Sequence, residues 1–129
     1  KLFMENICLN RDIVLKMELC EENPSVKMDT SLFEQVLINV IKNSAESIEE
    51  TGHILLRTSA EPLMLEVSDD GKGIAKEVEI KLFSPFFSTK PNGQGIGLIF
   101  IREVLMKHGC TFSLRTYEDG ITRFRICFP

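Results

Sequence analysis

The chain has 129 residues, of which 43% are hydrophobic and 26% charged, and its formal net charge is −4. This length and composition indicate one globular domain with a core of its own, while the negative charge argues against a general nucleic-acid-binding protein. No apolar stretch reaches the roughly 20 residues that a membrane-spanning helix needs.

The first part of the chain predicts short elements. We expect a short helix over residues 1–10, a strand over residues 13–19 that ends before Asn23–Pro24, and a brief strand over residues 26–28. Because the chain begins without Met, we also expect it to be a piece of a longer protein.

A long helix follows and should stop before Thr51–Gly52. Its apolar side chains recur at helical spacing, at Phe33, Val36, Leu37, Val40, Ile41 and Ile48. Asp29, Thr30 and Ser31 offer N-cap oxygens, and Glu34 follows Ser31 at the spacing of a capping box.

The remaining elements are two strand pairs and a second helix. Residues 53–59 and 63–68 predict strands joined at Glu61–Pro62, and residues 111–116 and 122–128 predict a second pair. Between the pairs lie weak helical character over residues 77–83 and a firm helix over residues 97–107, which ends at His108–Gly109. Sequential strand pairs favour an α+β fold, a two-layer α/β sandwich with a mixed, mostly antiparallel sheet covered on one face by helices.

Asn39 and Asn43 share one polar stripe of the long helix. Residues at helical spacing lie one above the other, so Glu46 belongs to the same stripe. An amide oxygen is a suitable ligand for Mg²⁺, which keeps waters and substrate phosphate oxygens as its other ligands. A solvated helix face is the alternative interpretation.

A carboxylate and two glycines follow the strand over residues 63–68. The segment Asp69-Asp-Gly71-Lys-Gly73-Ile74 joins a strand-end carboxylate to a turn whose backbone can approach a ligand closely. Such a carboxylate accepts a hydrogen bond from the exocyclic amine of adenine and disfavours the carbonyl of guanine. A calcium loop is the alternative, but the spaced oxygen ligands and distal Glu of an EF-hand are missing.

Two further segments lie in the long connection before the second helix. Phe83, Phe86 and Phe87 precede Lys90. A lysine suits the role of a positive charge placed at a phosphate. The alternative interpretation is that the aromatic residues form a small satellite core. Gly93, Gly95 and Gly97 lead into Leu98 and the second helix, where backbone N–H groups attract anions. A dinucleotide-binding turn has similar glycines but needs a strand directly before them.

These segments, in this order, resemble the ATP-binding catalytic domain of sensor histidine kinases, within the superfamily that includes DNA gyrase, heat-shock chaperone ATPases and MutL. The resemblance extends over residues 1–129, and Asn43-Ser-Ala-Glu46 with Pro85-Phe-Phe-Ser-Thr-Lys90 is most similar to kinases of the nitrogen-regulation kind. It implies a Bergerat-type fold that binds ATP and Mg²⁺ and donates the γ-phosphoryl group to a histidine, with an ATP lid over residues 72–95.

The resemblance also implies roles for individual residues. Asn43 would ligate Mg²⁺, Asp69 and Thr122 would contact adenine, and Lys90 would contact the β- and γ-phosphates. The expected catalytic residues are Asn39, Asn43 and Lys90, and the expected nucleotide-binding residues are Asn43, Glu46, Asp69, Gly71, Gly73, Ile74, Phe86, Lys90, Gly93, Gly95, Gly97, Leu98 and Thr122. Ser44 and Ser47 stand where relatives commonly carry Ala.

Position 39 separates the possible activities. Gyrase-like ATPases carry a Glu there as the general base for water, and the amide of Asn39 cannot accept a proton at neutral pH. Glu46 could act as a base, but it lies further along the helix. The alternatives are a gyrase- or MutL-like ATPase, a serine kinase of the anti-sigma-factor type, and an interaction module with a degenerate site.

The expected partners follow from the two histidines. Neither His53 nor His108 has the long helical context of a phospho-acceptor, so we expect the substrate histidine on a dimerisation domain of the same parent protein, with a response regulator downstream. The four cysteines match no zinc or redox spacing, which favours reduced thiols. We expect a cytoplasmic, monomeric domain, whether or not its parent is anchored in a membrane.

Overall fold

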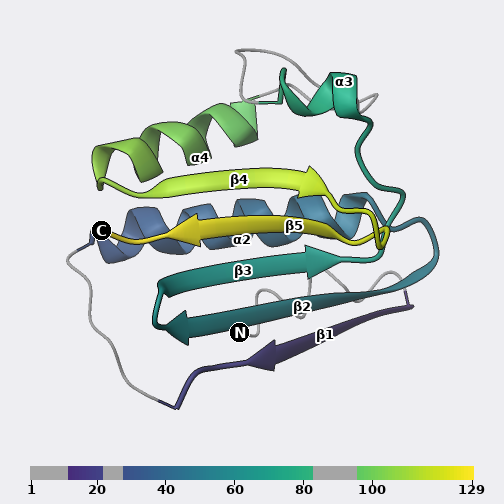
Figure 1. Ribbon diagram of the computed structural model, residues 1–129, viewed down its shortest axis with the longest axis horizontal. Helices are drawn as coiled ribbons and strands as arrows, with labels where there is room; N and C mark the ends of the chain where they lie inside the picture. The colour runs from purple at the N-terminus through teal and green to yellow at the C-terminus, as the bar shows by residue number, and fades with distance from the viewer. Residues whose placement is uncertain (1–11, 22–27, 83–95) are drawn as a thin grey trace.

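The chain forms a five-stranded sheet with helices on one face, in the computed structural model of residues 12–21, 28–82 and 96–129 (Figure 1). The strand order is β1-β2-β3-β5-β4, with β1 and β2 parallel and every other neighbouring pair antiparallel. The elements are β1 (Asp12–Glu18), α2 (Thr30–Glu46), β2 (Thr51–Ala60), β3 (Leu63–Asp69), α3 (Lys76–Glu79), α4 (Ile96–Lys107), β4 (Thr111–Thr116) and β5 (Thr122–Cys127). The predicted mixed sheet is confirmed.

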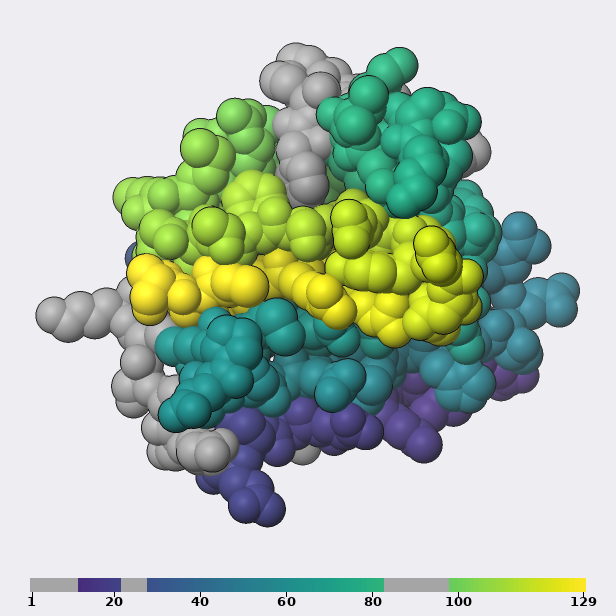
Figure 2. All heavy atoms as spheres, in the orientation of Figure 1, coloured from purple at the N-terminus to yellow at the C-terminus, as the bar shows by residue number. Residues whose placement is uncertain are grey.

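The core lies between the sheet and the two longer helices; in Figure 1, α2 runs behind β4 and β5, and α4 lies above β4. Alternate strand residues face the helices, because successive side chains of a strand point to opposite faces. Ile41 of α2, Ile101 and Leu105 of α4, and Ile126 of β5 are 0% exposed. The prediction of helices on one face is therefore confirmed, and Figure 2 shows the strands at the surface on the opposite face.

α2 begins at a different cap from the predicted capping box. Asp29 is the N-cap, and its Oδ1 accepts a hydrogen bond from the Leu32 N–H at 3.0 Å. The helix starts at Thr30, so Ser31 lies inside the first turn. The predicted capping box of Ser31 and Glu34 was therefore wrong, whereas Asp29, one of the three predicted N-cap candidates, is confirmed.

α2 also ends at Glu46, earlier than the predicted stop before Thr51. The Ser47 carbonyl accepts a hydrogen bond from the Lys72 N–H at 3.0 Å, so the turn after β3 ties down the end of the helix. Ile48 lies beyond the helix and is still 2% exposed in the core. The apolar pattern therefore predicted the burial of Ile48 correctly, but the prediction that Ile48 belongs to the helix was wrong.

The other element boundaries agree with the sequence to within a few residues. The β2–β3 hairpin turns at Glu61–Pro62 and α4 ends before Gly109, whose φ is +75°, both as predicted. The weak helix is only α3, and Met28 lies in no strand. The predicted helix over residues 1–10 and the rest of the predicted strand over residues 26–28 lie outside the described residues. None of the helices in the described ranges is long and apolar enough to cross a membrane.

Candidate functional site

Asp69 ends β3 and presents its carboxylate to α2. Its position, two residues after the buried Val67, places the side chain on the helix-facing side of the sheet. The residue is 4% exposed, and Oδ1 accepts hydrogen bonds from the Gly71 N–H at 2.9 Å and the Ser47 hydroxyl at 3.0 Å. A buried carboxylate that is held in place by such hydrogen bonds can accept a further hydrogen bond from a ligand.

The environment of Asp69 raises the pKa of its carboxyl group. Burial is the main cause, because it disfavours the charged form, and the neighbouring Asp70 adds to it by repulsion. Hydrogen bonds from Gly71, Ser47 and Ser44 act in the opposite direction without reversing the effect. A ligand amine that donates to Asp69 would therefore stabilise a carboxylate that the protein alone leaves under-stabilised.

The turn after β3 lies directly against the end of α2. A Cβ atom at Gly71 would stand 2.2 Å from Ser47 Oγ and 2.6 Å from the Ser47 carbonyl oxygen, so this position admits only glycine. Gly73 has a φ of +82°, a conformation that side chains other than glycine rarely adopt. The two predicted glycines thus permit close approach and a sharp turn, and their contact with a nucleotide stays a prediction.

Thr122 lies beside Asp69 and belongs to a hydrogen-bonded pair. It is the register partner of Asp69 on β5 and is 5% exposed. Its Oγ1 lies 2.7 Å from Oγ1 of Thr116, and the same Thr116 atom accepts the Ile74 N–H at 2.7 Å. Three predicted site residues, Asp69, Ile74 and Thr122, are therefore brought together at one end of the sheet.

The polar residues of α2 lie progressively farther from Asp69 along the helix axis. Asn43 accepts a backbone hydrogen bond from the Ser47 N–H at 3.2 Å, and Asn43 and Asn39 lie roughly 6 and 12 Å along the helix axis from Ser47. Asn39 Oδ1 accepts a hydrogen bond from Gln35 at 3.3 Å. Glu46 is exposed, whereas both asparagines are half-buried. The helix thus offers amide oxygens at increasing distances from Asp69.

The amides of this stripe fit a magnesium ion better than a fully protein-ligated metal. Among the described residues, no group of three His, Cys, Asp or Glu side chains could hold a metal ion. Mg²⁺ commonly takes one or two protein oxygens and completes its shell with water and substrate phosphates. Asn43 is a donor of the right kind for such a site.

The remaining predicted residues belong to α4 or lie outside the described residues. Gly97 is in the first turn of α4, and Leu98 is half-buried and packs against the core. The predictions for Phe86, Lys90, Gly93 and Gly95 fall outside the described residues. All of these assignments stay predictions.

Two residues of the site were not assigned a role from the sequence. Ser47 contacts Asp69, and its place one helical turn after Asn43 was visible in the sequence. Thr116 contacts Thr122 and Ile74 and donates its N–H to Glu79 Oε2 at 3.0 Å. No sequence signal marks Thr116, because its position depends on the register of β4 against β5.

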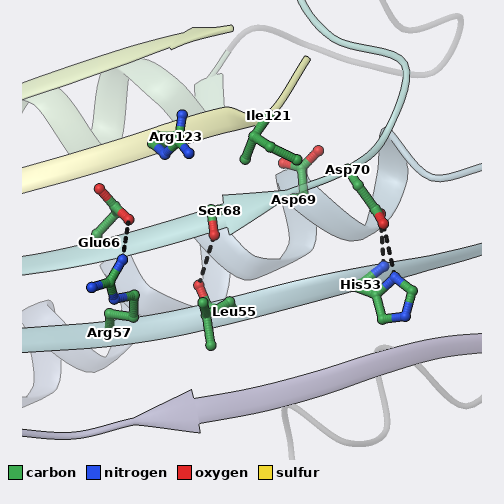
Figure 3. A pocket seen from close by; sticks show the side chains of 9 residues that line it. All are labelled: His53, Leu55, Arg57, Glu66, Ser68, Asp69, Asp70, Ile121 and Arg123. Atoms are coloured by element: carbon green, nitrogen blue, oxygen red, sulfur yellow. Dashed lines mark hydrogen bonds and ion pairs between the residues drawn. The ribbon is translucent and has the colours of Figure 1, made fainter. Parts of the chain in front are cut away.

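A hollow of about 270 Å³ lies on the open face of the sheet (Figure 3). It is lined by His53, Leu55, Arg57, Glu66, Ser68, Asp69, Asp70, Ile121 and Arg123. Its charged groups are paired with one another or with neighbours: Glu66 lies 2.6 Å from Arg125 and 3.9 Å from Arg57, and Asp70 lies 2.8 Å from His53 Nδ1. Asp69 is the one predicted site residue among its lining residues, and Asn39, Asn43, Ile74 and Thr122 are not, so this hollow does not coincide with the predicted site.

The pKa of Asp70 is lowered, in contrast to that of Asp69. Burial raises it, but the hydrogen bonds from the backbone and ring of His53, together with the charge of His53, outweigh burial. Two neighbouring carboxylates therefore have different environments, and only Asp69 lacks a basic partner among its described contacts.

Comparison with known proteins identifies the family. Residues 28–129 match the model of the histidine kinase-, DNA gyrase B- and HSP90-like ATPase family. The chain is 31% identical over 121 residues to the sensor histidine kinase ZraS of Escherichia coli O157:H7, covering 92% of this chain and 26% of ZraS. It is 32% identical over 121 residues to the sensory histidine kinase/phosphatase NtrB of Rhodobacter capsulatus, covering 82% of this chain and 34% of NtrB.

Solved structures agree with these relatives. The catalytic domain of histidine kinase ThkA superposes with a TM-score of 0.83 at 26% identity, covering 99% of this chain and 92% of that structure. The mycobacterial sensor histidine kinase MprB has the same fold, with a TM-score of 0.84 at 24% identity and coverage of 99% and 91%. The chain spans about a quarter of the length of the ZraS proteins it matches. Fold, sequence and site together show that this chain belongs to the histidine kinase-, DNA gyrase B- and HSP90-like ATPase family, with sensor histidine kinases among its relatives.

Proposed function

We propose that the chain is the ATP-binding module of a sensor histidine kinase. It binds ATP with Mg²⁺ and donates the γ-phosphoryl group to a histidine on a separate dimerisation domain of the same parent protein, from which a response regulator receives it. The observation that carries this proposal is the buried Asp69 carboxylate, joined through Ser47 to the helix that bears Asn43 and Asn39.

The base lies at Asp69 in this proposal. The carboxylate accepts a hydrogen bond from the 6-amine of adenine, and Thr122 contributes the second contact from the adjacent strand. Gly71, Gly73 and Ile74 form the turn that approaches the base. A nucleotide with a carbonyl in place of the amine would face Asp69 with two acceptors, which disfavours guanine.

In this proposal the phosphates extend along α2 from the base. Asn43 would hold Mg²⁺ with its amide oxygen, and the ion neutralises charge on the phosphates when it is bound. Glu46 lies near the end of the same helix. The other residues that would contact the base or phosphates are Phe86, Lys90, Gly93, Gly95, Gly97 and Leu98, and residues 72–95 would serve as the ATP lid.

Asn39 favours transfer over hydrolysis. Its amide accepts a hydrogen bond from Gln35, and an amide cannot take a proton from water at neutral pH. In the transfer step, the bond between the γ-phosphorus and the bridging oxygen breaks, a bond to the histidine nitrogen forms, and ADP leaves. Catalysis then depends on positioning and on charge neutralisation.

The two histidines of this chain are engaged in structural contacts, which supports an acceptor on another domain. His108 Nε2 accepts the Asp29 N–H at 3.3 Å, and its Nδ1 donates to the Val104 carbonyl at 2.8 Å. His53 pairs with Asp70. We place the domain in the cytoplasm, where ATP and response regulators are available.

The test is phosphorylation of the parent's dimerisation domain by this chain with γ-labelled ATP and Mg²⁺. The proposal predicts an acid-labile, base-stable phosphoprotein, and little ATP hydrolysis by the chain alone. Asn43→Asp should reduce Mg²⁺-dependent transfer more than adenosine binding, and Asp69→Asn should reduce adenosine binding itself. An acid-stable phosphoserine would indicate a serine kinase, and rapid hydrolysis without acceptor would indicate a gyrase-like ATPase.

A further inference from the structure

Three arginines gather around one tyrosine on the open face of the sheet. The guanidinium carbons of Arg115, Arg123 and Arg125 lie 4.6, 4.8 and 4.9 Å from the centroid of the Tyr117 ring. A guanidinium is attracted to an aromatic ring at such distances. The ring therefore holds three positive charges close together, in a chain whose formal net charge is −4. We call these four residues the arginine cluster.

The strand register places two of these charges directly opposite each other. Arg115 of β4 is the register partner of Arg123 of β5, so the two side chains share the open face. Like charges that face each other across two strands are destabilising. A local rule that is broken at the surface is typical of a functional position.

The neighbouring register row shows the opposite arrangement. Its charged residues alternate in sign across β1, β2, β3 and β5: Glu18, Arg57, Glu66 and Arg125. Arg57 lies 3.5 Å from Glu18 and 3.9 Å from Glu66, and Figure 3 shows Arg57 and Glu66 side by side. Because opposite charges are neighbours along this row, it is balanced without an external partner.

Two carboxylates neutralise two of the three arginines of the cluster. Asp119 lies 2.8 Å from Arg123, and the buried Glu66 lies 2.6 Å from Arg125. Over the ranges that the structure describes, no carboxylate lies within ion-pairing distance of Arg115, and this residue is exposed. The cluster therefore carries one uncompensated positive charge at the surface of the sheet.

An acidic protein segment is the partner that fits this cluster. A guanidinium presents a planar fork of N–H donors that matches a carboxylate. Arg123 and Arg125 lie two positions apart on one strand, which is also the spacing of side chains that share one face of an extended segment. Alternating carboxylates of an extended partner would therefore face the cluster. The phosphates of a nucleic acid would be repelled by the net negative charge of the chain.

The strength of such contacts decides where the partner comes from. An exposed ion pair strengthens binding by about fivefold at most, so three pairs give a dissociation constant of roughly 10 mM for a free segment. A segment of the same protein reaches millimolar effective concentrations through its linker. This chain covers 26% of ZraS, so most of that relative lies outside the matched part.

We infer that the arginine cluster docks an acidic segment of the same parent protein, from outside residues 1–129. The inference goes beyond the proposed function and takes from it only a parent protein with further domains. Arg115 is the residue that the docked segment neutralises, since Arg123 and Arg125 already have carboxylate partners. The cluster lies on the face of the sheet away from α2, so the segment and a nucleotide beside Asp69 can be bound together.

The first experiment uses Tyr117 as its probe, because the chain has no other tyrosine and no tryptophan. The chain is titrated at low salt with a peptide of alternating Glu and Ser, and its tyrosine emission is recorded. We expect saturable binding with a dissociation constant of roughly 10 mM, and none for the peptide in which Gln replaces Glu. Arg115→Gln should weaken binding about fivefold. Lys16→Gln, which removes an exposed charge from β1 at the other edge, should leave it unchanged.

The second experiment identifies the segment in the parent protein. Arg115→Lys keeps the charge and supplies an amine, which a zero-length carbodiimide joins to a carboxylate in contact with it. Mass spectrometry should find the lysine introduced at position 115 joined to an Asp or Glu outside residues 1–129. High salt during the reaction should reduce this cross-link, because salt screens exposed charges. The isolated chain, treated in the same way, gives the cross-links that arise within residues 1–129.

Three results would overturn the inference. The first is a set of cross-links in the parent that is confined to those of the isolated chain. The second is equal binding of the Glu and Gln peptides. The third is binding of a single-stranded oligonucleotide that depends on Arg115, without binding of the Glu peptide, because it would indicate a nucleic-acid surface.

ATP binding judges the proposed function separately. If the parent binds ATP and phosphorylates its histidine but forms no cross-link outside residues 1–129, the inference alone fails. If the cross-link forms and the chain binds no ATP, the proposed function fails and the inference stands.

Discussion

Ser47 Oγ at the end of α2 lies 3.0 Å from Oδ1 of Asp69 at the end of β3 and 2.8 Å from the carbonyl oxygen of Ser44. A hydroxyl has one proton, so Ser47 can donate to only one of these two acceptors at a time. This contact joins two residues that lie 22 positions apart in the sequence. It links the helix of the predicted metal ligand to the carboxylate that is predicted to recognise the base.

Asp69→Asn should weaken ATP binding without weakening the fold. The amide keeps an acceptor for Ser47 and Gly71 but removes the charge that a ligand amine would meet, so the affinity should fall roughly 10- to 100-fold. Isothermal titration with Mg²⁺·ATP measures this change. An affinity within twofold of the wild-type would contradict the role of Asp69.

The same substitution should leave the free energy of unfolding at neutral pH equal to the wild-type value or higher. Because burial raises the pKa of Asp69 above its unfolded value, the stability that this group contributes is present at low pH and lost as pH rises through the folded pKa. At neutral pH the ionised carboxylate is therefore unfavourable, and Asn avoids that cost. Urea unfolding at pH 7 tests the sign.

Adenosine affinity should fall as the pH decreases through the raised pKa of Asp69. The ionised carboxylate accepts the amine, so binding favours the deprotonated form and releases a proton. Ser47→Ala removes a hydrogen bond that lowers this pKa, and it should move the pH of half-maximal affinity upwards. Adenosine is the probe because it lacks phosphates, and Asp69→Asn is the control, which should show no such pH dependence.

Gly71→Ala should destabilise the domain and abolish tight nucleotide binding. The added methyl would meet Ser47 Oγ at 2.2 Å and the Ser47 carbonyl oxygen at 2.6 Å, which forces the turn away from α2 at a cost of about 1–3 kcal/mol. Thermal unfolding and ATP titration measure both effects. Adding Ser47→Ala should not rescue the variant, because the carbonyl oxygen remains.

Gly120→Ala is the matched control for Gly71→Ala. Gly120 has a φ of +83°, but no atom lies within 4 Å of the position that an added methyl group would take. The substitution should therefore cost about 1 kcal/mol and leave nucleotide affinity unchanged. Equal effects of the two substitutions on affinity would show that the contact between the turn and α2 has no role in binding.

His108→Ala should lower the free energy of unfolding by about 1–2 kcal/mol. The ring joins the end of α4 to the N-cap of α2 through its contacts with Val104 and Asp29, and alanine leaves both backbone groups without that partner. Urea unfolding measures the loss, with the exposed neighbour Lys107→Ala as the control. A difference between the two variants below about 0.3 kcal/mol would argue against this link.

The sequence predicted those features that depend on local pattern. Helical spacing of apolar residues located α2 and α4, and paired β-prone segments located the two hairpins. Asp69 could be singled out because it follows a β-prone segment directly and precedes Gly71 and Gly73. Each of these features depends on residues that lie close to one another in the sequence.

Features that depend on contacts between distant segments could not be predicted. The end of α2 at Glu46 follows from the hydrogen bond between Lys72 and Ser47, which lie 25 positions apart in the sequence. Thr116 became visible only through the pairing of β4 with β5 and through its contact with Ile74. Local propensity does not encode strand register or the meeting of a turn with a helix end.

The most direct test of adenine binding at Asp69 is a backbone amide NMR titration of the chain with Mg²⁺·ATP. We predict saturable binding with the largest shifts at Gly71, Ile74 and Thr122, followed by residues of α2 from Asn43 to Asn39. Only small shifts are expected at Arg57 and Glu66, which line the hollow on the open face of the sheet. Large shifts at that hollow, with Gly71 and Ile74 unchanged, would contradict a nucleotide site between Asp69 and α2.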